Sequence, residues 1–419
     1  MRSVASEASG KTIKIVHFAP VRLVWLLIVP FLAVAAWDAA RLAYADSLSR
    51  LNTSDSLRQA VQLDPGNADF RELLAEHLAG DGLDPNPELK AAVSLSPLNS
   101  HWWERLGFQA ESDGDFEGAE RDLKEGVQVD RTFGPRWALM NYYFRRGNQD
   151  QFWHWAKSSL DMSFGDLTNI FRLCWIMSQD ETLIRNTMPV RREILTQYVS
   201  FLSTNGHLDA AAAIATRAAE LADPGDLHIL TSYCDRSIGK DNSTAVPVWN
   251  TLCKRKLLPF DELDPSAGQI ITNGDFSIDP TQIGFDWREP TVDGAPVLPD
   301  RPGVRIKMSG KQPEDCLLLF EPIPLSPGHQ YRVSYKYRSE GEETVSGLTW
   351  SVNAVDAPGM ILSGSQDLKK SSDWTVDQFT FAAGTHTAAT LEFRYKRPSG
   401  KVRWQGEVAI GGVSSELVH

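Results

Sequence analysis

The chain has 419 residues, 42% of them hydrophobic, so we expect about two or three domains with true cores rather than general disorder. Its net charge of -12 argues against broad nucleic-acid binding. The four cysteines lack metal-ligand spacing and are too few for a disulfide scaffold, so we expect no metal centre built on them.

A basic leader precedes an uncharged apolar run near the N-terminus. Residues 1–22 carry four basic residues and one acidic residue, and Leu23–Trp37 carries no charge. Residues 23–44 are mostly apolar and long enough to cross a bilayer as one helix. We therefore predict an uncleaved transmembrane helix with residues 1–22 in the cytoplasm. The protein would then be a single-pass inner-membrane protein with its bulk on the periplasmic side.

Two other interpretations of this segment remain open. Ala43-Tyr44-Ala45 fits the small-x-small pattern of a signal-peptide cleavage site, which would make the protein secreted. The segment could also be a buried helix of a soluble domain.

From residue 47 to about residue 260 the hydrophobic pattern is helical throughout. Two amphipathic helices meet at Asp113-Gly114-Asp115, and the small residues Gly107 and Ala119 predict close contact between them. The turns between such helix pairs recur about every 34 residues. The pattern resembles a tetratricopeptide repeat (TPR), and the residues that carry this resemblance are Trp103, Leu106, Gly107, Phe116, Ala119 and Leu123.

This resemblance implies an all-α solenoid over residues 47–260 whose first helices line a concave groove. An aromatic patch flanked by charge suits a peptide or a partner helix. The candidate groove residues are Glu104, Phe108, Glu111, Tyr142, Arg145 and Arg146.

Near residue 260 the period changes from helical to alternating, as in Tyr331–Arg338. About eight such segments with short turns predict an all-β sandwich over residues 268–416. Ile271–Phe276, Gly284–Trp287 and Pro322–Tyr331 resemble motifs of galactose-binding-like jelly rolls, the fold of many carbohydrate-binding modules. That family often has an Asp pair before its last strand, and one of the two helps to hold calcium; Gly411-Gly412 stand there in this chain, so we do not carry calcium over from the resemblance.

Aromatic rings and outward-facing basic residues are the candidate glycan contacts of the sandwich. We expect Trp287, Trp350 and Trp374 to lie in the core. The basic residues would form one strip suited to an anionic glycan if their strands pair. The candidate glycan-binding residues are Trp404, Lys336, Arg338, Arg394 and Lys396.

We find no Walker loop, zinc-protease helix, nucleophile elbow or dinucleotide fingerprint, so we expect a non-enzyme without cofactors. The sequence predicts an envelope scaffold that binds a protein through its solenoid and a glycan through its sandwich, in assembly or export of a surface polysaccharide. The alternative is a protein–protein adaptor whose sandwich binds no sugar. Cys234 and Cys253 lie on consecutive predicted helices, and either a bridge or two free thiols is consistent with their placement.

Overall fold

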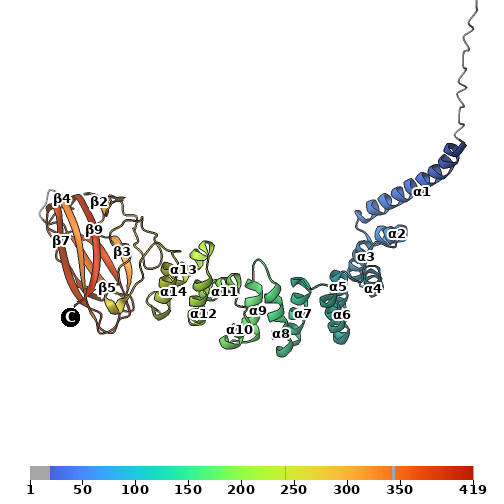
Figure 1. The fold of residues 1–419 in the computed structure, drawn as a ribbon, viewed down its shortest axis with the longest axis horizontal. Coiled ribbons are helices and arrows are strands. Elements are labelled where there is room, and N and C mark those ends of the chain that lie inside the picture. The colour runs from blue at the N-terminus through green and yellow to red at the C-terminus, as the bar shows by residue number, and fades with distance from the viewer. Residues whose placement is uncertain (1–18, 241, 342–344, 419) are drawn as a thin grey trace, which may run out of the picture. The chain divides into compact units, whose positions relative to one another are not determined.

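The computed structural model describes residues 19–240, 242–341 and 345–418 (Figure 1). The chain forms two compact units, the first ending at Trp155 and the second beginning at Ala156. Most of the predicted cytoplasmic leader, residues 1–18, lies outside the described residues.

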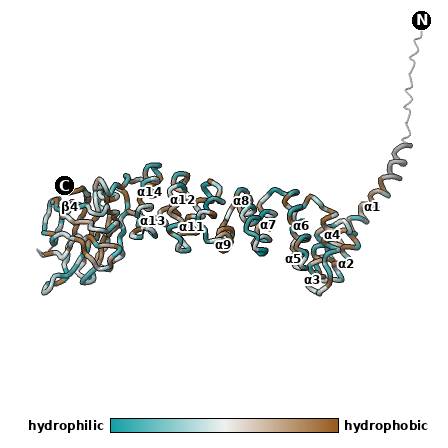
Figure 2. Tube along the Cα trace, turned by 90° about the horizontal axis from the view of Figure 1, so that it is seen from below, coloured by the Kyte–Doolittle hydropathy of each residue, from teal (hydrophilic) through white to brown (hydrophobic). Residues whose placement is uncertain are grey.

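The first described element is one long helix, α1 (Ala19–Ser49), which continues through Pro30. Its segment Ile28–Ser49 is long and apolar enough to cross a membrane. Figure 2 shows hydrophobic colour along this segment. The predicted N-terminal apolar helix is therefore present.

The remaining helices of the first unit follow α1 in the paired arrangement predicted from the sequence. Short turns connect them, which places consecutive helices antiparallel. Their bounds are α2 (Ser54–Leu63), α3 (Ala68–Gly80), α4 (Asn86–Leu95), α5 (Ser100–Ser112), α6 (Phe116–Val129) and α7 (Phe133–Arg146), and α8 (Gln149–Met162) runs across the boundary between the units.

Close contact between α5 and α6 depends on a missing side chain, as the sequence predicted. A Cβ atom on Gly107 would lie 2.8 Å from Cγ of Leu123 and 3.3 Å from the carbonyl oxygen of Ala119. Both distances are tighter than ordinary van der Waals contact, so any larger residue would push the two helices apart.

The second unit begins with helices and ends with strands. Where the TPR period fades, α9 and α10 are only 10 and 7 residues long. The described helices of this unit after α8 are α9 (Thr168–Met177), α10 (Glu181–Thr187), α11 (Arg192–Thr204), α12 (Leu208–Leu221), α13 (Leu227–Ser237) and α14 (Asn242–Lys254).

Two antiparallel sheets then form the predicted β-sandwich. One has the strand order β1-β2-β9-β4-β7 and the other has the order β3-β8-β5-β6. The described strands are β1 (Val297–Pro299), β2 (Val304–Ser309), β3 (Asp315–Pro324), β4 (Gln330–Gly341), β5 (Leu348–Ala354), β6 (Ile361–Gly364), β7 (Ser371–Ala382), β8 (Ala388–Lys396) and β9 (Gln405–Leu417).

Aromatic side chains fill the space between the two sheets. Trp350 is buried, and its ring centroid lies 4.9 Å from that of Phe393, 5.6 Å from that of Tyr335 and 5.9 Å from that of Trp287. Each such pair adds about 0.5–1.5 kcal/mol beyond the area it buries. The prediction that Trp287 and Trp350 lie in the core is confirmed.

The last helix pair shares a core with the first segment of the sandwich. Trp249 on α14 is buried, and its ring stacks on Phe260 and meets Phe285 edge-on, both at centroid distances of 5.8 Å. A Cβ atom on Gly284 would lie 2.2 Å from the indole of Trp249, so only glycine fits there.

A polar contact closes the same junction. The carboxylate of Asp235 on α13 accepts a hydrogen bond of 2.7 Å from the backbone N–H of Gly284 and pairs with the guanidinium of Arg288. These contacts fix the helices to the sandwich within the second unit.

All four cysteines are buried free thiols, so Cys234 and Cys253 form no bridge in this structure. The Cys234 thiol instead donates to the carbonyl oxygen of Ala245 at 3.6 Å. Burial raises the pKa of Cys253 to about 12, which keeps this thiol protonated and unreactive at neutral pH.

Candidate functional site

The charged residues of the predicted groove are paired with one another. Glu111 lies on α5 and Arg145 on α7. The Arg145 guanidinium donates from Nε to Oε1 of Glu111 at 2.8 Å and from Nη2 to Oε2 at 2.6 Å. This two-point pair joins neighbouring helix pairs and neutralises both charges.

Tyr142 was predicted to line the groove, and this is wrong. Its side chain is buried, and its hydroxyl donates to the carbonyl oxygen of Phe116 at 2.8 Å. The guanidinium of Arg146 lies 3.6 Å above the ring of Phe116, so it too packs on the neighbouring helix. Both side chains hold α7 against α6.

Phe108 is the accessible aromatic residue of the predicted groove set, with 38% of its surface exposed. Glu104, one turn earlier on the same helix, is half-buried, and burial raises the pKa of its carboxyl. An exposed ring beside a partly desolvated carboxyl gives this part of α5 the chemistry to contact a partner side chain.

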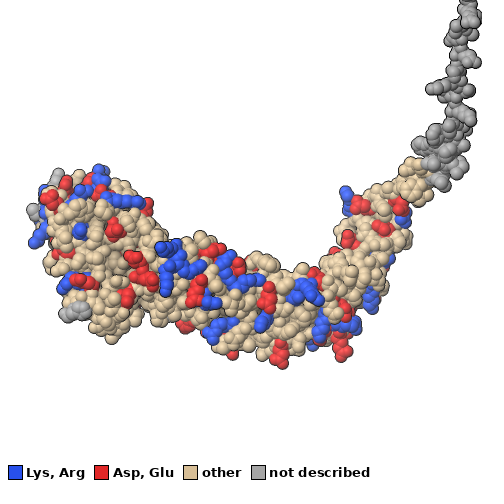
Figure 3. Space-filling view, in the orientation of Figure 1, with Lys and Arg blue, Asp and Glu red and all other residues tan. Residues whose placement is uncertain are grey.

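Ion pairs between successive helix pairs extend beyond the residues that the sequence singled out. In the first unit, Arg105 on α5 lies 2.8 Å from Glu72 and 2.5 Å from Glu76, both on α3. Basic and acidic side chains alternate along the helical region in Figure 3. Such pairing sets the register between repeats rather than leaving charge free for a ligand.

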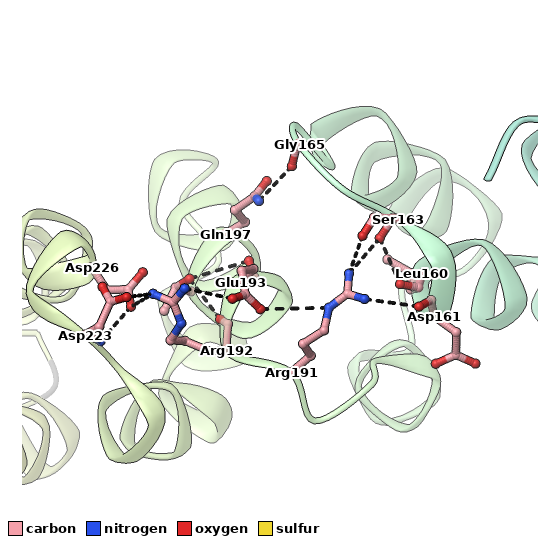
Figure 4. A network of polar contacts seen from close by, with 11 residues as sticks. Leu160, Asp161, Ser163, Gly165, Arg191, Arg192, Glu193, Gln197, Asp223 and Asp226 are labelled. Atoms are coloured by element: carbon pink, nitrogen blue, oxygen red, sulfur yellow. Dashed lines mark hydrogen bonds and ion pairs between the residues drawn. The ribbon is translucent and has the colours of Figure 1, made fainter. Parts of the chain in front are cut away.

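The second unit contains a similar network around Arg191 and Arg192 (Figure 4). Arg191 points toward the α8–α9 turn and donates to the carbonyl oxygens of Asp161 and Ser163, at 3.1 and 2.5 Å. Arg192 donates to Asp226 at 3.0 Å and to Glu193 at 2.7 Å. Both guanidinium groups therefore serve packing between helices.

The predicted basic strip on the sandwich does not exist as one surface. Lys336 and Arg338 lie on β4, whereas Arg394 and Lys396 lie on β8, and these strands belong to different sheets. The alternation was predicted correctly, but β4 pairs with β7 and β9, not with β8. The four cations therefore cannot bind one glycan chain together as neighbours.

The prediction that Trp404 serves as a sugar platform is also wrong, because its side chain is only 2% exposed. Two glycines make room for its ring. A Cβ atom on Gly341 would lie 2.5 Å from the indole, and one on Gly406 would lie 2.8 Å from it. These two glycines stand opposite each other on β4 and β9, a pairing that no local sequence pattern reveals.

Trp374, predicted to be a core residue, is instead 42% exposed. It lies on β7, the edge strand of the five-stranded sheet. The guanidinium of Arg338 lies 5.4 Å from the centre of its ring. Val376, two residues further along β7, is also exposed and stands opposite Lys336 in the register.

Lys336 completes this surface. Its methylene chain crosses Gly412 on β9, where a Cβ atom would lie 3.3 Å from Cδ of Lys336. Among the described residues, Lys336 forms no ion pair, while Arg338 donates to Asp300 at 2.7 Å. We call Trp374, Val376, Lys336 and Arg338 the β4–β7 face. It combines an exposed ring with two cations on one side of one sheet.

The described residues thus define a chain with an apolar N-terminal helix, further helices in a paired arrangement and a β-sandwich of two antiparallel sheets. No family model matches the chain, and no curated protein matches it.

Solved structures resemble its two parts separately. PilF of Pseudomonas aeruginosa is similar over the helical region, with 18% identity and a TM-score of 0.28, covering 46% of this chain and 94% of that chain. Over the C-terminal region, a CBM4 structure has 16% identity and a TM-score of 0.28, covering 35% of this chain and 99% of that chain. The CBM22-1 xylan-binding domain of Xyn10C from Paenibacillus barcinonensis has 12% identity and a TM-score of 0.25, covering 36% and 96%.

Proposed function

We propose that the protein is a non-catalytic envelope scaffold that binds an acidic glycan on the β4–β7 face of its sandwich and a protein partner along its solenoid. Its setting would be the inner membrane, with α1 as the anchor and the bulk of the chain in the periplasm, in assembly or export of a surface polysaccharide. The observation that carries the glycan site is the exposed Trp374 ring beside Lys336 and Arg338.

The chemistry of this face favours a sugar that bears a carboxylate. The indole of Trp374 offers a flat apolar surface against which the C–H face of a pyranose can stack. Lys336 supplies a cation that forms no ion pair with any described carboxylate. Asp300 holds the guanidinium of Arg338 in place and neutralises part of its positive charge. Exposed charges of this kind attract anions in a salt-dependent way.

Salt titration of glycan binding by the full-length protein tests this site. We expect Trp374→Ala to weaken binding of a polyuronate by about two- to tenfold at every salt concentration, because aromatic stacking contributes about 0.5–1.5 kcal/mol. Lys336→Ala should weaken binding at low salt and flatten its salt dependence.

The matched control is Lys396→Ala, which removes an exposed lysine from β8 of the other sheet. Its binding should equal that of the wild type. Equal losses from the two lysine variants would refute a site on the β4–β7 face. If the wild type binds no acidic or neutral glycan at any ionic strength, the protein-adaptor alternative takes its place.

For the solenoid, Phe108 is the contact that we propose for a peptide or partner helix. Its exposure supports this role, together with the half-buried carboxyl of Glu104 one turn earlier on the same helix. A partner copurified with the wild type should be lost with Phe108→Ala and retained with Leu98→Ala, which alters an exposed apolar side chain on the α4–α5 turn. Equal retention by both variants would place the partner elsewhere.

A further inference from the structure

The apolar segment of α1 and the packed end of α1 belong to one uninterrupted helix, Ala19–Ser49. The part of this helix that precedes the packed end, Ala19–Trp37, has 19 residues, or about 28 Å at 1.5 Å per residue. The hydrocarbon core of a bilayer is about 30 Å thick. A chain that spanned the membrane with this helix would therefore have no linker between the membrane and the solenoid.

The last two turns of α1 are part of the first helical hairpin. Ala45 is fully buried, and with Leu48 it packs in one cluster with Leu57, Ala60 and Val61 of α2. Asn52, in a left-handed conformation with φ of 51°, lies in the turn between the helices. A capping box between Thr53 and Ser56 then starts α2.

The part of α1 before this hairpin exposes large apolar side chains on every side. Val29, Phe31, Leu32 and Val34 are all more than half exposed. Successive residues of an α-helix are rotated by about 100°, so these four side chains point in different directions around the axis. A groove on a protein partner covers one stripe of a helix, whereas lipid surrounds the whole of it. The all-round exposure therefore favours a bilayer as the occupant.

We propose that α1 is at once the membrane span and the first helix of the first solenoid hairpin. This inference rests on the proposed membrane location. Trp37, a residue type that prefers the membrane interface, precedes the buried Ala45 by eight positions, or about 12 Å along the helix. The first hairpin therefore stands directly on the bilayer surface.

The same packing argues against Ala43-Tyr44-Ala45 as a processing site. Ala45 would be the residue before the cut, and it lies inside the hairpin core. Cleavage there would remove α1 from one side of this core and leave α2, a helix of 10 residues, packed only against Phe70 and Leu74 of α3.

Two variants of the full-length protein in membranes test this arrangement. Ala45→Glu places a charge in the hairpin core, and Tyr44→Glu places the same charge at a neighbouring position that is 57% exposed. We expect intact mass to show residues 1–45 retained in the wild type. We also expect amide hydrogen exchange in α2 to accelerate by about tenfold or more in Ala45→Glu alone, because an unpaired charge is costly to bury.

A wild-type protein that begins at Asp46 would overturn the proposal. So would equal exchange in α2 for the two variants, since α1 would then not pack in the hairpin. An intact protein found only in the soluble fraction would refute the membrane span and with it this inference. Failure of glycan binding in the salt titration would bear on the β4–β7 face and on none of these results.

Discussion

Replacing Gly107 by leucine should lower the free energy of unfolding of the first unit by about 1–3 kcal/mol, the usual range for overpacking. A Cβ atom at this position already meets Leu123 at 2.8 Å, and the backbone oxygen of Ala119 at 3.3 Å cannot move without moving α6. Urea unfolding followed by helical circular dichroism measures this loss as a shift in the transition midpoint.

Gly126 on α6 is the matched control. A Cβ atom there would lie 3.5 Å from Cβ of Trp103, which is ordinary contact. Gly126→Ala should therefore gain up to about 1 kcal/mol from helix propensity, whereas Gly107→Ala should not realise that gain. The same change in stability for the two alanine variants would contradict the close approach of α5 and α6.

The second large effect is expected from pH acting on Glu321, which is completely buried on β3. Its Oε1 accepts a hydrogen bond of 2.6 Å from the backbone N–H of Thr272, and its Oε2 has no partner among the described residues. Burial raises the pKa of this carboxyl well above 4.5, and the nearby Asp286 raises it further. The folded protein therefore holds a proton that the unfolded chain releases.

The direction of the pH dependence follows from that difference. Above about pH 4.5 the native state binds more protons than the unfolded state, so stability falls as pH rises, by up to about 1.4 kcal/mol per pH unit until the folded-state pKa is reached. Glu321→Gln replaces the titrating carboxyl by a neutral amide. The free energy of unfolding should then fall less steeply with pH and be higher at neutral pH than in the wild type. Burial also raises the pKa of Asp286, so the stability of Glu321→Gln should still fall with rising pH, but less steeply than that of the wild type.

Chemical unfolding of the wild type and Glu321→Gln between pH 4 and 8 measures this effect. The control is Glu340→Gln, which alters an exposed carboxylate on β4 and should leave the slope unchanged. An identical slope in Glu321→Gln and the wild type would show that Glu321 is ionised in the folded protein.

Features set by neighbouring residues in the sequence were predictable. The spacing of apolar residues gave the helix pairs, and the small size of Gly107 and Ala119 gave their closest contact. Alternation likewise identified which side chains of β4 face outward. These properties follow from the helical and strand periods, which a single segment displays on its own.

Features that depend on which strands pair were not predictable. Lys336 and Arg394 both face outward, but no local pattern reveals that β4 and β8 belong to different sheets. For a related reason, Trp404 was predicted to be exposed and is buried, whereas Trp374 was predicted to be buried and is exposed. Trp404 is covered because Gly341 and Gly406 come together across two strands, and Trp374 is open because β7 has no neighbour beyond it in its sheet.

The junction between the last helix pair and the sandwich sets an order in which this protein can finish folding. Trp249 on α14 remains uncovered until Phe285 has emerged, 36 residues later, which takes about 2–7 s at the usual rates of synthesis. The side-chain amide of Asn242 finds its hydrogen-bond acceptor much later, because that acceptor is the carbonyl oxygen of Thr387, 145 residues further along the chain. A chain that leaves the ribosome or a translocation channel N-terminus first therefore carries an incompletely bonded helical end until β1 to β7 of the sandwich have followed it.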